Sequence, residues 1–226
     1  MIKQLALSGA VATLLFGITS CKKEATAVTP TSPKTPFGLV KSTADMDGEI
    51  VTYQYDDQFR LKEKRSSTYR NSYSYPPGQV VVDVYDSTNS LARTIHYTLD
   101  ANGRAVSSDA GETFHYDGDG YLIKQSRKND KTIEYAIEQG NRKAILENGK
   151  QALSLTYYQN IAEMRKTGEE FCNGRPNQNL VQTSNDAAQM IYLNYVYHYD
   201  LQGRIDRVSW SGPGGYQGYL IYEYFD

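Results

Sequence analysis

The sequence predicts a soluble all-β protein. We expect an antiparallel hairpin meander that forms a curved sheet or partly closed barrel, after a signal peptide and a disordered tether. Three observations predict it. Twenty tyrosines stand against six Phe and one Trp, and tyrosine favours strands with one wet face. An aromatic frame recurs along the chain. Glycine, asparagine and aspartate punctuate it at hairpin spacing.

The repeated frame is aromatic, any residue, aromatic or Leu, Asp, two variable residues, Gly, Arg, aliphatic. Aspartate is present in all copies, while Phe59 replaces one glycine and Tyr121 replaces one arginine. Aromatic residues two positions apart point to one face of a strand. Four segments carry the frame: Tyr53–Leu61, Tyr97–Ala105, Phe114–Leu122 and Tyr197–Ile205.

The polar part of the frame predicts a hairpin turn. An Asp side chain can accept a hydrogen bond from the backbone two residues on and so start a turn. Glycine can adopt the positive φ that short hairpins need. We therefore assign a structural turn role to Asp56, Asp100, Asp117, Asp200, Gly103, Gly120 and Gly203.

The frame resembles the YD repeat of the Rhs and teneurin family, and Tyr197–Ile205 matches it best. In that family the repeats coil into a spiral β-shell, for which this chain is too short. The whole layout is more similar to a family of Bacteroidota lipoproteins with YD-like hairpins and a porin-like meander. Gly174–Val181 also resembles a segment of that group. The resemblance covers residues 37–226 and implies a fold but no activity.

The first residues predict a lipid anchor. Lys3 precedes an uncharged run, Leu5–Ile18, which is too short to span a bilayer but suits a signal peptide. Residues 18–21 resemble the lipobox of bacterial lipoproteins, which implies cleavage after Ser20 and acylation of Cys21. We expect three parts: a signal peptide at 1–20, the lipidated cysteine with a Pro/Thr-rich linker at 21–36, and a single YD-repeat-like β-meander domain at 37–226.

The predicted location is the outer membrane, held by lipid alone, with the domain on the periplasmic or cell-surface side. Lys22 follows the cysteine where an aspartate would retain a lipoprotein in the inner membrane. The 24 basic and 26 acidic residues are interspersed, which argues against nucleic acid as a partner.

No catalytic set, metal site or cofactor motif is visible in the sequence. Cys172 matches no cysteine-enzyme signature, and its neighbours predict a small packed thiol. The three histidines at positions 96, 115 and 198 lack ligand spacing. The Asp-Gly-Asp-Gly run at 117–120 and the Asp-Met-Asp-Gly-Glu run at 45–49 do not continue into a calcium-binding loop, so hairpin turns are favoured.

The best binding candidates are Trp210, Tyr216 and Tyr219, in and beside a Gly-rich loop. Aromatic residues on such a loop can stack on sugars or anchor a partner, although strand-end packing is the alternative. We expect a non-catalytic envelope platform that binds a glycan or a protein or acts structurally. The alternative is a glycan-processing enzyme that uses carboxylates on the concave face.

Overall fold

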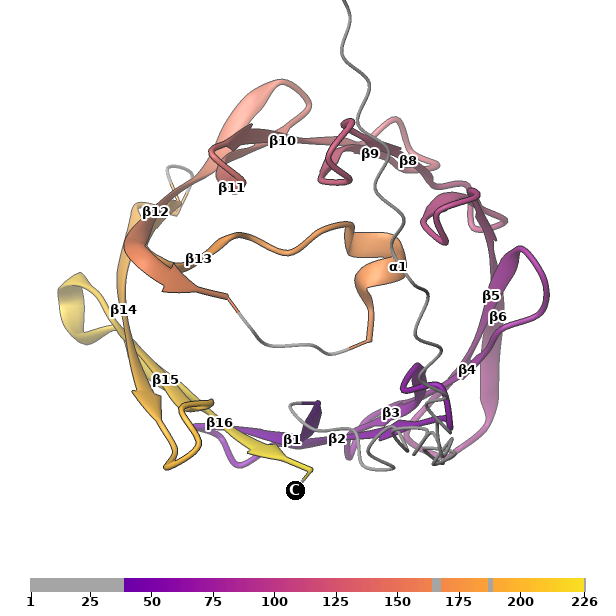
Figure 1. Ribbon diagram of the computed structural model, residues 1–226, viewed down its shortest axis with the longest axis horizontal. Coiled ribbons are helices and arrows are strands. Elements are labelled where there is room, and N and C mark those ends of the chain that lie inside the picture. The colour runs from indigo at the N-terminus through magenta and orange to yellow at the C-terminus, as the bar shows by residue number, and fades with distance from the viewer. Residues whose placement is uncertain (1–38, 164–167, 187–188, 226) are drawn as a thin grey trace, which may run out of the picture. The chain divides into compact units, whose positions relative to one another are not determined.

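The computed structural model describes residues 39–163, 168–186 and 189–225, and these form a closed antiparallel barrel of sixteen strands (Figure 1). Every strand pairs with its neighbours in sequence, and β1 closes the ring by pairing with β16, from Val40↔Tyr224 to Asp45↔Leu220. The expected curved sheet or partly closed barrel is therefore corrected to full closure. Sequence periodicity marks strands, but it carries no signal for pairing between the first and the last.

The strands are short, and two brief helical turns accompany them. The bounds are β1 Val40–Asp45, β2 Ile50–Tyr55, β3 Leu61–Arg65, β4 Arg70–Ser74, β5 Gln79–Tyr85, β6 Leu91–Leu99, β7 Ala105–Ser108, β8 Thr113–Tyr116, β9 Leu122–Ser126, β10 Thr132–Glu138, β11 Asn141–Glu147, β12 Lys150–Ala162, α1 Glu170–Asn173, β13 Asn179–Asp186, β14 Ile191–Tyr199, β15 Ile205–Ser211, η1 Pro213–Gly215 and β16 Gln217–Tyr224. Among the described residues no helix has the length and apolar character needed to cross a membrane.

The inner face of the barrel is apolar and aromatic. Buried residues along β1–β5 form one cluster, Ala105, Phe114 and Leu122 form a second, and Leu180, Ile205 and Val208 form a third. Helix α1 lies inside the ring (Figure 1), and its Phe171 packs against the first two clusters. The core is thus a lining along the inner wall.

The outer face is polar. Residues paired across antiparallel strands share a face, and alternation places Thr94, Lys124 and Glu223 opposite the inner aromatics. Polar contacts join neighbouring strands there: Lys124 to Glu134 at 3.1 Å, Thr94 Oγ1 to Asp83 at 2.7 Å and Ser42 Oγ to Glu223 at 2.9 Å. Apolar side chains such as Ile50, Val196 and Ile221 are exposed among these polar residues.

Each repeat aspartate sits at the start of a turn and organises it. In the turn after β6, Asp100 Oδ1 accepts from the amides of Asn102 and Arg104 at 2.8 and 2.9 Å, while Oδ2 pairs with the Arg104 guanidinium at 2.8 Å. Asp56 with Arg60 and Asp200 with Arg204 repeat the arrangement. The backbone amide of Arg104, which donates to Asp100, contributes to holding the pKa of that carboxyl below its usual range. The frame's arginine therefore neutralises its own aspartate.

The inner tyrosines cap carbonyls at β-bulges. A bulge leaves the ladder locally disrupted, and five tyrosine hydroxyls donate to carbonyls next to such register shifts. The pairs are Tyr55 to Val40 at 2.9 Å, Tyr75 to Leu61 at 2.6 Å, Tyr157 to Arg142 at 2.5 Å, Tyr197 to Val181 at 2.8 Å and Tyr224 to Ile205 at 2.7 Å. Each acceptor lies on the preceding strand. Two of these tyrosines, Tyr55 and Tyr197, belong to the repeated frame, and phenylalanine at those positions could not donate the bond.

Replacing Tyr157 by phenylalanine should destabilise the barrel by about 1–2 kcal/mol, because the partly buried Arg142 carbonyl loses a donor while the ring stays packed. Urea denaturation of the full chain measures the loss. Tyr192→Phe on the outer face, where the side chain is 41% exposed, is the matched control and should change little. Equal effects of the two substitutions would contradict the capping role.

The buried and half-buried tyrosines of the inner wall also predict that the barrel is sensitive to high pH. Burial raises the pKa of Tyr157 to about 12 and raises the pKa of Tyr73, Tyr97, Tyr116 and Tyr135. Unfolded tyrosines titrate near pH ~10, so the folded state holds its protons longer. Stability is therefore fully present below pH ~10 and is lost as pH rises through about 12. Urea midpoints measured from pH 8 upward should fall above pH ~10, and tyrosinate absorbance measured in parallel should rise as the buried hydroxyls lose their protons. An unchanged midpoint to pH ~11.5 would contradict this.

Candidate functional site

A segment between β12 and β13 folds into the barrel, and we call its described residues 168–178 the inner segment (Figure 1). Two glycines at positive φ allow it to approach the wall. A Cβ added at Gly168 would lie 2.7 Å from Leu61 Cβ, and one at Gly174 would lie 2.8 Å from the Leu122 amide nitrogen. Backbone bonds at 2.9 Å from Arg175 to Gly120 and from Gln178 to Gly140 tie the segment to two turns.

The acidic anchor of the inner segment is Glu169. Its carboxylate contacts Lys64 Nζ at 3.2 Å and accepts from the Tyr73 hydroxyl at 3.0 Å. Burial lowers the pKa of Lys64, but the Glu169 carboxylate, together with Tyr53 and Tyr69, raises that pKa overall. Lys64 therefore stays charged against its partner, and the segment is joined to β3 and β4.

The apolar anchor is Phe171. Its ring meets Tyr97 edge to face at 5.3 Å, and its carbonyl accepts from the Tyr116 hydroxyl at 3.4 Å. The neighbouring Cys172 is half-buried against the second core cluster, with Sγ donating to the Glu169 carbonyl at 3.3 Å. Phe171 thus joins two stretches of the inner wall.

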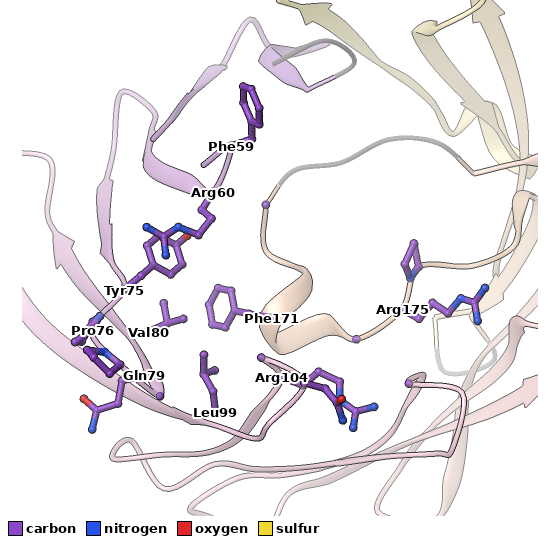
Figure 2. A pocket seen from close by; sticks show the side chains of 18 of the residues that line it. Phe59, Arg60, Tyr75, Pro76, Gln79, Val80, Leu99, Arg104, Phe171 and Arg175 are labelled. Atoms are coloured by element: carbon purple, nitrogen blue, oxygen red, sulfur yellow. The ribbon is translucent and has the colours of Figure 1, made fainter. Parts of the chain in front are cut away.

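A cavity of about 930 Å³ opens between the inner segment and the turns that follow β2, β4, β6 and β8 (Figure 2). We call it the end cavity. Phe59, Tyr75 and Phe171 supply aromatic surface, and the prolines at 76, 77 and 176 border it. Its volume lies within the range of small-molecule sites, about 300–1,000 Å³.

Three arginines line the end cavity. Arg60 lies 4.1 Å over the Tyr75 ring and pairs with Asp56, and Arg104 lies 5.0 Å over the Tyr116 ring and pairs with Asp100. Arg175, from the inner segment, lies 5.4 Å over Tyr121. Asp119 is the one carboxylate among the described lining residues. The site thus combines aromatic faces with positioned cations.

One departure from the repeat frame lines this cavity, and the other contacts two of its lining residues, Gly174 and Arg175. Phe59 stands where other copies have glycine, and it adopts φ 61 with 40% of its side chain exposed. A bulky residue at positive φ is strained. Tyr121 stands where other copies have arginine, is 6% exposed, and forms a bridge with Gly174 of the inner segment. Sequence reasoning recorded both as irregularities and missed what they share.

The side chains of the candidate binding residues Trp210, Tyr216 and Tyr219 do not share one face of the sheet, although Trp210 and Tyr219 both border a cavity of about 570 Å³. Trp210 faces inward, against Tyr195 and over Gly218. Tyr219 takes the opposite face under Arg207, because it pairs with Ser209 and alternation places it outside. Tyr216 is 57% exposed in the loop. The structure thus divides this predicted group between two faces and a loop.

The other predicted residues have simpler positions. Gly103, Gly120 and Gly203 have positive φ and lie in turns, and Gly103 and Gly120 also line the end cavity. The Asp117 carboxylate accepts from the Asp119 and Tyr121 amides, as turn aspartates do. The three histidines are exposed, and the described residues contain no cluster of three metal-ligating side chains. Cys21 and the linker fall in the part that the structure does not describe.

The inner segment itself was missed by the sequence analysis. Its signals were weak: Gly168, the Gly-Arg-Pro run from 174 to 176, and a polar stretch that fits no hairpin. None of these says on which side of a sheet a loop will lie.

The fold is a closed, porin-like β-barrel, and comparison with solved structures agrees. A crystal structure of a porin-like protein from Bacteroides uniformis matches with a TM-score of 0.64 at 15% identity, covering 85% of this chain and 98% of that one. A porin-like protein from Bacteroides vulgatus matches with a TM-score of 0.56 at 13% identity, covering 82% and 98%. These similarities concern the fold alone.

No family model matches the chain, and no curated protein is significantly similar. The relation to the YD-repeat family, like the lipobox, therefore stays a prediction.

Removing the Phe171 ring should destabilise the barrel by about 2 kcal/mol, below the cost at a fully buried site, because the residue is half-buried between two clusters. Thermal unfolding of Phe171→Ala measures this, and Tyr192→Ala on the outer face is the control. A melting temperature equal to that of the control would show that the inner segment does not support the wall.

Proposed function

We propose that this chain is a lipid-anchored envelope protein of the outer membrane whose barrel is water-exposed and binds a glycan, without catalysis, in the end cavity. The observation that carries the proposal is Phe59. It keeps an exposed aromatic ring at the cavity in a conformation that glycine adopts without strain. Strained residues persist where the surrounding structure enforces them, often at ligand sites.

The polarity of the wall supports a barrel that lies outside the bilayer. A membrane-spanning barrel has an apolar outer band, whereas ion pairs such as Lys124–Glu134 join strands on the outer face here. The buried apolar side chains face inward, and the inner segment packs against two of their clusters. We therefore favour an anchor through the acylated Cys21 rather than through the barrel.

The composition of the cavity supports binding over hydrolysis. Aromatic rings stack on sugar faces, and cations can orient polar substituents. A glycan hydrolase needs two carboxylates about 5–10 Å apart across the scissile bond, but Asp119 is the one described carboxylate that lines this cavity. The enzyme hypothesis is thus the less favoured alternative.

The full chain, purified in detergent, should bind a subset of glycans on an array. Phe59→Gly should weaken that binding about tenfold by removing a stacking face worth about 1.4 kcal/mol. The same change should leave stability equal or raise it by about 1 kcal/mol, because it relieves the left-handed backbone. Gain of stability with loss of binding separates function from folding.

Asn89→Gly is the matched control. Asn89 has φ 63 in the turn between β5 and β6, and its side chain does not line the end cavity. The substitution Asn89→Gly should relieve backbone strain in that turn without changing glycan binding. Absence of binding to every glycan on the array, or full binding by Phe59→Gly, would overturn the proposal.

A further inference from the structure

The three arginines that line the end cavity differ in whether a carboxylate neutralises them. Arg60 and Arg104 are each neutralised by a turn aspartate, with guanidinium-to-carboxylate distances of 2.6 and 2.8 Å. Among the residues that the structure describes, none forms an ion pair with Arg175. Arg175 therefore brings an uncompensated positive charge to the cavity.

Arg175 is also held in place. Its amide donates to the Gly120 carbonyl at 2.9 Å. The residue before it, Gly174, packs closely against the wall, and the residue after it, Pro176, has a fixed φ. The guanidinium lies over the buried Tyr121 ring at 5.4 Å and is nevertheless exposed to solvent. A cation positioned on a fixed backbone loses little freedom when it binds an anion.

The surroundings select a cyclic anion over a free ion. Phe59 and Phe171 line the same cavity (Figure 2). The face of an aromatic ring suits the C–H surface of a sugar, and a guanidinium matches a carboxylate through two parallel hydrogen bonds. Arg175 lies on the other side of helix α1 from Phe59 and Phe171 (Figure 2), so a ligand that uses both features contains several sugar rings together with a carboxylate.

From these contacts we propose that the ligand of the end cavity is an acidic glycan that contains uronic acid, with one sugar carboxylate paired to the Arg175 guanidinium. This inference rests on the proposed glycan-binding function and deepens it. Asp119, the described acid in the lining, stands in an exposed turn after Gly118. The turn carboxylates of Asp56 and Asp100 are already occupied by their own arginines.

Calorimetry on the full chain with an oligogalacturonate tests the inference, with its methyl ester as the matched probe. The ester keeps the rings and removes the charge. We expect the acid to bind at least about tenfold more tightly than the ester, and added salt to weaken the acid alone. Arg175→Gln should weaken the acid about tenfold and leave the ester unchanged.

Arg65→Gln on the outer face is the control variant and should leave both probes unchanged. Arg65 is exposed and does not line the end cavity. Equal binding of acid and ester, or binding of a neutral glycan without binding of the acid, would overturn the acidic ligand while leaving glycan binding intact. Absence of binding to every glycan on the array would overturn both proposals.

Discussion

The sixteen strands enclose a lumen, and the rest of this structure depends on how that lumen is filled. Eight strands enclose an interior that side chains can fill, whereas sixteen leave a lumen too wide for them. The inner wall is nevertheless apolar, with Leu61, Val80 and Leu180 almost fully buried. An apolar wall around open water would lose the benefit of burial. The inner segment meets this constraint, because Phe171 covers two clusters and Glu169 is paired inside the barrel with Lys64.

Bulges interrupt the wall of the ring at many hairpins, and at five of the described register shifts a tyrosine hydroxyl satisfies the neighbouring carbonyl. Register shifts next to Leu61, Arg142 and Ile205 bend short strands at one end of the barrel. Each shift leaves a carbonyl that a hydroxyl from the following strand satisfies. Where the inner segment docks, Tyr116 donates instead to the carbonyls of Phe171 and Cys172, at 3.4 and 3.5 Å. Tyrosine hydroxyls therefore satisfy carbonyls both in the barrel wall and in the inner segment that packs against it.

The sequence predicted local structure well and long-range structure poorly. Turn chemistry at Asp100 and strand alternation at Tyr97 are fixed by neighbours within a few residues, so the hairpin meander was correctly predicted. Closure between β1 and β16 joins residues about 180 apart and has no local signal. The same limit applies to the cavity, because Phe59, Arg104 and Arg175 come to line one space only once the meander has closed into a barrel. Trp210 and Tyr219 lie close in sequence, on the two strands of one hairpin, but they point to opposite faces because Trp210 pairs with Gly218 and Tyr219 pairs with Ser209.

The cavity and the repeat are connected through the two positions where the frame fails. A glycine at position 59 would relieve the turn but remove an exposed ring from the cavity. An arginine at 121 would restore the frame but place a charge where a buried tyrosine now bridges Gly174. Each departure breaks the local pattern of the hairpin. Phe59 adds aromatic surface to the cavity, and Tyr121 supports the Arg175 guanidinium. Departures from local rules cluster at functional or strained sites, so the proximity of these two to the end cavity supports the proposed binding role of that cavity.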